Sequence, residues 1–180
     1  MSSMEKKALQ TKHMVISAML CAVGVILLML GSLFTVVDLS VAVVASLLCI
    51  WAVIEIGGFY PWLIWIVTSV LALLLVPQKS PALYYAFFLG YYPIVKEKIE
   101  RKFALTLAIV CKLAVFHVSL LLMLLGMKLF VPAMLASLAW NWFLLVLYVA
   151  SIVAFLVYDY ALTKLISGYL TKLRRHFKLK

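Results

Sequence analysis

Long apolar runs, separated by short polar or turn-forming segments, repeat along the whole chain. A helix that crosses the roughly 30 Å hydrocarbon core of a bilayer needs about 20 apolar residues. The sequence predicts six such spans, at 14–34, 39–56, 60–76, 82–95, 103–127 and 138–165. The fourth run is short, so it must thin the bilayer locally or be shielded by neighbouring helices. The pattern therefore predicts an all-α, polytopic membrane protein: a single transmembrane domain that is a bundle of about six helices.

Residues that start or stop helices mark the ends of several runs. Asp38 follows the first run, and Gly57 and Gly58 end the second. Pro61 opens the third, where its missing N–H costs nothing because the first turn of a helix leaves its donors unpaired. The apolar link over 128–137 is open to two interpretations, a short connection or a re-entrant or interfacial segment.

Composition supports the membrane assignment and excludes an ordinary soluble domain. Of the 180 residues, 68% are hydrophobic and 12% are charged. A soluble domain has about a quarter of its residues charged. Without a solvated surface of the usual kind, the chain must have lipid around most of it.

Basic residues fix the expected orientation, because cytoplasmic loops retain Lys and Arg. With six spans, both termini lie on one side of the membrane. Lys79 and Lys128 fall on the other side, and Lys112 lies inside a span. We therefore expect a multi-pass protein of the cell membrane with both termini and a basic tail, about 168–180, in the cytoplasm, where it attracts anionic lipid rather than nucleic acid. The thirteen basic residues on this side are Lys6, Lys7, Lys12, Lys96, Lys98, Arg101, Lys102, Lys164, Lys172, Arg174, Arg175, Lys178 and Lys180.

Two ionisable residues are predicted to lie at membrane depth, where an isolated charge costs at least about 2.5 kcal/mol. Lys112 lies ten residues after Lys102 in the fifth span, and Asp159 has a comparable depth in the sixth. One interpretation is an intramembrane Lys112–Asp159 ion pair. The other is that Lys112 extends to the cytoplasmic interface while Asp159 pairs with Lys164.

The densest block of charge follows the fourth span, in "IVKEKIERK". Lys96 and Glu100 are four residues apart, as are Glu97 and Arg101. Opposite charges at this spacing lie on one helix face and stabilise it by about 0.2–0.5 kcal/mol per pair. The sequence predicts a short interfacial helix here, which could bind anionic lipid or extend a contact with a partner.

Polar and aromatic residues collect towards the predicted outer side. Trp and Tyr at this level form the usual interfacial belt, and that is the first interpretation. The second is an outward-facing ligand cavity with aromatic walls and polar anchors. The candidate ligand-binding residues are Asp38, Tyr84, Tyr85, His117, Trp140 and Asn141.

Motifs for enzyme chemistry are not found in the sequence. It has no His-Glu pair at helical spacing, no Asp-rich metal motif, no Gly-rich phosphate loop and no nucleophile-His arrangement. We therefore expect no catalytic residues, no metal site and no cofactor. Cys21, Cys49 and Cys111 lie inside spans without paired spacing and are interpreted as small packing residues.

Small residues form a stripe on the first predicted helix. Ala18 and Ala22 are four residues apart, as are Ser17 and Cys21. Such stripes let two helices approach closely in lipid, where van der Waals contact replaces the hydrophobic effect as the driving force. The partner could be another helix of this chain or a separate subunit.

With about 180 residues, six spans, cytoplasmic termini and Ala-x-x-x-Ala in its first helix, the chain resembles the substrate-binding S component of energy-coupling factor transporters. The resemblance implies an outward-facing cavity for a vitamin or a transition-metal ion, a shared transmembrane coupling subunit and two cytoplasmic ATPases. It also implies that Ala18 and Ala22 contact the coupling subunit. No His lies close to the first Met, so a metal substrate is not expected.

Two functions from different classes follow. The first is the substrate-binding membrane subunit of an uptake transporter for a small molecule such as a vitamin. The second is a structural or regulatory membrane protein that uses its cytoplasmic charges to bind lipid or a partner, and a membrane enzyme is less favoured than either. If the candidate ligand-binding side chains surround one outward cavity, the transporter function is favoured. If other side chains fill that space, the structural or regulatory function is favoured.

Overall fold

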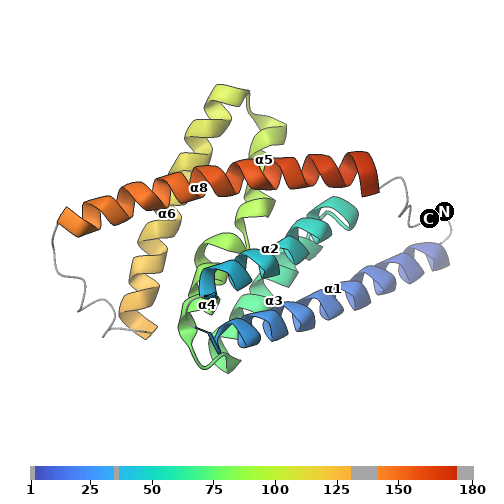
Figure 1. Ribbon diagram of the computed structural model, residues 1–180. Coiled ribbons are helices and arrows are strands. Elements are labelled where there is room, and N and C mark those ends of the chain that lie inside the picture. Colours follow the sequence, from blue (N-terminus) through green and yellow to red (C-terminus); the bar gives the residue numbers. More distant parts are fainter. Residues whose placement is uncertain (1–2, 35–36, 131–141, 174–180) are drawn as a thin grey trace. The chain divides into compact units, whose positions relative to one another are not determined.

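Every regular element of the described chain is helical. The structure is a computed structural model that describes residues 3–34, 37–130 and 142–173, and no strand occurs among them. Four of the described helices are long and apolar enough to cross a membrane, which agrees with the membrane assignment from composition. The chain divides into two compact units, Met1–Pro132 and Ala133–Lys180, which are described in turn. Figure 1 shows the helices of both units.

Three helices pack together at the start of the first unit: α1 (Ser3–Gly31), α2 (Asp38–Glu55) and α3 (Tyr60–Leu75). The ring of His13 contacts that of Tyr60, and further along both helices Gly24 lies against Thr68. The residue numbers rise in both helices from the first contact to the second, so α1 and α3 run in the same direction. α2, which lies between them in the sequence, runs the opposite way, since Gly31 at the end of α1 meets Val41 near the start of α2.

The boundaries of α2 and α3 lie within one residue of the predicted spans. α1 is different, because it begins at Ser3 and not near 14. Hydropathy detects the part of a helix that fits in lipid, whereas the helix itself continues into its polar first turns. The apolar stretch that qualifies as a membrane span is Lys7–Gly31.

The turn between α2 and α3 depends on two glycines. Gly57 and Gly58 have φ values of +66° and +64°, a region that other residues rarely adopt. Pro61 then lies in the first turn of α3, as the sequence predicted. The two consecutive left-handed residues reverse the chain abruptly, and neither has a side chain.

The predicted span 82–95 is not one continuous α-helix. It contains the end of α4 (Lys79–Tyr84), the π-helical segment η1 (Tyr85–Leu89) and the start of α5 (Tyr92–Lys102). A π-helical turn holds one residue more than an α-helical turn, so its side chains change direction. The chain then reverses after Phe103 into α6 (Leu105–Phe130).

Close packing against α3 explains where this segment bends. Gly90 has ordinary helical dihedrals, yet a Cβ atom added there would lie 2.6 Å from Cδ1 of Trp65. The indole Nε1 of Trp65 also donates a hydrogen bond of 3.0 Å to the carbonyl oxygen of Ala86 inside η1. Thus α3 supplies both the surface that excludes a side chain at position 90 and a donor for the irregular backbone.

The second unit contains α8 (Trp142–Gly168), followed by the π-helical segment η2 (Tyr169–Leu173). Hydroxyl groups of α8 bond back to their own helix, as Ser151 does to the carbonyl oxygen of Tyr148. Such bonds satisfy polar side chains within an apolar helix. The re-entrant alternative for 128–137 falls mostly outside the described residues, as does the basic tail from 174 onward.

Candidate functional site: the charged end of α5

α5 has a buried face and a charged face. Ile94 and Ile99 are buried against the rest of the unit, whereas Glu97 and Lys98 are exposed. Both predicted charge pairs on this helix are confirmed: Lys96 Nζ lies 3.0 Å from Glu100, and the Arg101 guanidinium lies 3.9 Å from Glu97. The two pairs differ in setting, because Lys96 is only 1% exposed and Arg101 is 85% exposed.

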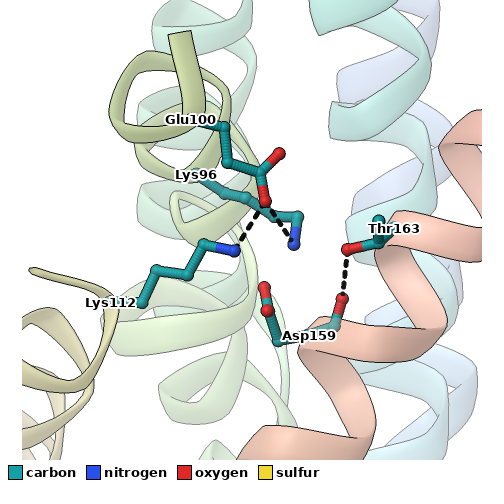
Figure 2. A network of polar contacts seen from close by, with 5 residues as sticks. All are labelled: Lys96, Glu100, Lys112, Asp159 and Thr163. Atoms are coloured by element: carbon teal, nitrogen blue, oxygen red, sulfur yellow. Dashed lines mark hydrogen bonds and ion pairs between the residues drawn. The ribbon is translucent and has the colours of Figure 1, made fainter. Parts of the chain in front are cut away.

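Glu100 joins two lysines from different helices. Its Oε1 atom accepts a hydrogen bond of 2.5 Å from Lys112 on α6 and also contacts Lys96 at 3.0 Å. Figure 2 shows the two ammonium groups converging on this one oxygen. The Lys112 side chain is 11% exposed and that of Glu100 is 41% exposed. The cluster therefore connects α5 to α6 across their turn.

Electrostatics favours the charged form of Glu100. Burial raises the pKa of its carboxyl, but hydrogen bonds from Lys112 and Lys96 lower that pKa by more. The pKa of Glu100 thus lies below its usual value. Such a carboxylate stays ionised at neutral pH and acts as a fixed anion between two cations.

The predicted Lys112–Asp159 pair stays a prediction. Asp159 belongs to α8, in the second unit, where its backbone oxygen accepts a hydrogen bond of 2.9 Å from the hydroxyl of Thr163 (Figure 2). Sequence reasoning did not identify Glu100 as a partner of Lys112. Symmetry about the turn at Phe103 would not have identified the pair, because Glu100 lies three residues before Phe103 and Lys112 lies nine residues after it.

A groove lies on the other side of α5, between this helix and the turn that joins α2 to α3. Its volume is about 740 Å³. The glycines at 57 and 58 leave room for it, since neither has a side chain. The groove is lined by Val53, Gly57, Gly58, Pro61, Ile94, Glu97, Lys98, Arg101 and Lys102.

The groove combines an apolar wall with a basic rim. Three of its side chains are cations and one, Glu97, is an anion. The ammonium of Lys98 lies 4.9 Å from the centre of the Trp62 ring, a cation–π contact at the start of α3. An anion with an apolar part is therefore the chemical class that this surface fits best.

The candidate ligand-binding residues of the predicted outward site lie in different environments. Asp38 is buried at the start of α2, where Oδ2 accepts a hydrogen bond of 3.3 Å from Gln78. Its Oδ1 has no hydrogen-bond partner among the described residues. Tyr84 lies within electrostatic range of Asp38, and Tyr85 is buried.

His117, another candidate ligand-binding residue, is exposed on α6, with Nδ1 2.7 Å from the carbonyl oxygen of Leu113. Trp140 and Asn141 lie outside the described residues, so a shared cavity stays a prediction.

Two small-residue stripes of α1 have different surroundings. Ser17 and Cys21 are buried, and the Cys21 thiol lies 3.8 Å from the backbone oxygen of Ile64 on α3. Ala18 and Ala22 are exposed. The first stripe thus packs within the chain, and the second remains available at the surface of α1.

Within the described ranges, no group of three His, Cys, Asp or Glu side chains could hold a metal ion. No family model, no curated protein and no solved structure matches this chain.

Proposed function

We propose that the chain is the substrate-binding membrane subunit of an energy-coupling-factor type uptake transporter. The observation that carries the proposal is the exposure of Ala18 and Ala22 on α1, beside a second small-residue stripe that already packs against α3. A helix needs small side chains where another helix approaches closely. The internal contact of α1 uses Ser17, Cys21 and Gly24, so it does not explain the alanines.

The proposed topology has six crossings, with both termini in the cytoplasm. It is supported by the parallel course of α1 and α3, which successive odd-numbered crossings require. The fourth crossing would consist of α4, η1 and the start of α5. Irregular backbone at membrane depth is tolerated only where protein covers it, and in η1 the side chains of Tyr85, Ala86 and Leu89 are buried.

The proposed substrate is a small molecule bound from the outer side, at the predicted set of polar and aromatic residues. Asp38 supports this choice, because its buried Oδ1 has no hydrogen-bond partner in the part of the chain that the structure describes. A buried acceptor of this kind costs free energy unless a ligand, a proton or water satisfies it. Discontinuous helices are also a recurrent feature of membrane binding sites, and the irregular α4–η1–α5 segment follows Gln78, the partner of Asp38.

The experiment is affinity purification of the tagged chain from its native host, followed by identification of retained proteins and small molecules. We expect a transmembrane coupling subunit and two ATPases. Ala18→Leu with Ala22→Leu should abolish their recovery, because the larger side chains separate the helices. Met19→Leu with Val23→Leu is the matched control on the same helix, since both residues are exposed. Recovery of no ATPase by the unaltered chain, or equal recovery by both double variants, would contradict the proposal.

A second candidate function is that of a structural or regulatory membrane protein that binds lipid or a partner through its basic side. The groove beside α5 favours it, since three cations line that groove. Under this alternative, purification would recover no ATPase and no small molecule. Membrane lipids are expected partners under either function.

A further inference from the structure

The groove beside α5 is an open surface depression with a basic rim. One wall is the end of α2 with the glycine turn, and the other is the charged half of α5. The φ values at Gly57 and Gly58 hold the chain where a residue with a Cβ atom would be strained. A space of about 740 Å³ is within the range of small-molecule sites.

Within the described ranges, the contacts that orient the basic side chains on the rim are weak. Arg101 is 85% exposed and lies 3.9 Å from Glu97, so most of its guanidinium donors face solvent. Lys98 lies against Trp62 and Lys102 lies 5.7 Å from the ring of Phe103. With three cations and one carboxylate, the rim has a formal charge of +2. A guanidinium beside two ammonium groups is a suitable donor set for a phosphate group.

The apolar wall and the position of the groove favour a ligand that has an apolar part beside its anionic group. Val53, Pro61 and Ile94 form this wall. Val53 lies near the end of α2, whose apolar stretch Asp38–Glu55 is long enough to cross a membrane. The groove therefore lies where a hydrocarbon layer would give way to headgroups, and Trp62 is a residue type common at that level.

We propose that this groove binds the phosphate group of a net-anionic ligand, with Arg101, Lys98 and Lys102 as the ligating side chains. The phosphate can belong to an acidic phospholipid headgroup or to a soluble phosphate compound, and both present the same anionic oxygens. The apolar wall accommodates the glycerol and upper acyl carbons of a lipid. The inference does not rest on the proposed transport function.

The test is native mass spectrometry of the full chain released from detergent. The probes are phosphatidylglycerol, phosphatidylcholine and inorganic pyrophosphate. The groove variant is Lys98→Gln, Arg101→Gln and Lys102→Gln together. The matched control is Lys7→Gln, Lys12→Gln and Lys164→Gln, which removes the same charge from exposed positions outside the groove. A third variant, Val53→Trp, fills the groove and keeps every charge.

We expect the unaltered chain and the control variant to retain phosphatidylglycerol in preference to phosphatidylcholine. The groove variant should lose roughly fivefold in affinity for each basic residue replaced, and Val53→Trp should also lose the preference. If pyrophosphate displaces the lipid or binds in its place, the site recognises phosphate from either source. If only phosphatidylglycerol binds, the phosphate that the groove recognises is that of a membrane lipid.

The proposal is overturned if the unaltered chain shows no preference for phosphatidylglycerol and no bound pyrophosphate. It is also overturned if the groove variant and Val53→Trp both bind as well as the control variant. Circular dichroism and size-exclusion chromatography confirm that each variant is helical and monodisperse before it is compared.

Discussion

Lys112 on α6 and Glu100 on α5 are joined by a hydrogen bond of 2.5 Å, and Lys96 contacts the same carboxylate oxygen. Because Lys96 and Lys112 are almost fully enclosed by protein, removing their shared anion costs more than breaking an exposed charge pair would. The exposure of Glu100 itself, 41%, moderates this contribution through solvent screening.

Replacing Glu100 tests the strength of the cluster. Glu100→Gln removes the anion that two buried ammonium groups contact, and we expect a loss of about 1–3 kcal/mol in the free energy of unfolding. Glu97→Gln makes the same change of charge on the exposed face and should cost within about 0.5 kcal/mol. Chemical unfolding in detergent micelles, followed by circular dichroism, measures both. Equal effects of the two substitutions would contradict the assigned role of Glu100.

The same carboxylate predicts a dependence of stability on acid. Its pKa in the folded protein lies below the ordinary value of 4.5. The contribution of Glu100 is therefore fully present above that value and is lost as the pH falls through the lower, folded-state pKa. The unaltered chain should lose stability in this acid range more steeply than Glu100→Gln. Melting temperatures of both proteins across the range provide the comparison, and parallel curves would exclude the effect.

Gly90 tests the contact between α3 and the irregular segment. Its dihedral angles suit any residue, so only the lack of space explains the glycine. In Gly90→Ala the new methyl would lie 2.6 Å from Trp65 Cδ1 and 2.8 Å from the backbone oxygen of Tyr85. We expect a loss of about 1–3 kcal/mol in stability.

Gly168 provides a matched control for this substitution, because an added Cβ atom there meets nothing within 4 Å. Gly168→Ala should leave stability unchanged or raise it by up to about 1 kcal/mol, as alanine favours a helix. Thermal unfolding of the two variants compares them directly. If Gly90→Ala is as stable as Gly168→Ala, the close packing at position 90 is not required.

The proposed topology is tested with single cysteines in a chain from which Cys21, Cys49 and Cys111 have been replaced by alanine. Lys79→Cys is expected on the outer side, and Lys98→Cys, on the exposed face of α5, in the cytoplasm. A thiol reagent that cannot cross the membrane should therefore label Lys79→Cys in intact cells and label Lys98→Cys only after the cells are opened. The reverse pattern would invert the orientation, and labelling of both in intact cells would refute it.

The parts of the fold that local signals determine could be predicted from the sequence. The ends of α2 and α3 were predicted to within one residue, because Asp38, the glycine pair and Pro61 act on their own neighbours. The break at Gly90 could not be found in this way. It depends on Trp65, a residue of another helix.

The candidate sites show the same division. Spacing of four residues identified the pair of Lys96 with Glu100, which is a property of any helix. The additional partner, Lys112, required knowledge of where α5 turns into α6. Predicting the groove requires the tertiary structure, because its two walls are far apart in the sequence. Its size also depends on the backbone conformation of Gly57 and Gly58.

The order of Glu100 and Lys112 along the chain has a consequence for biosynthesis. Glu100 precedes Lys112 by twelve residues, so the ribosome makes the anion before the cation that enters the apolar helix. When α6 leaves the translocation channel sideways into lipid, the counterion of its lysine is already present on the preceding helix. The α5–α6 hairpin can therefore bring Lys112 into the apolar region with a carboxylate already beside its ammonium group.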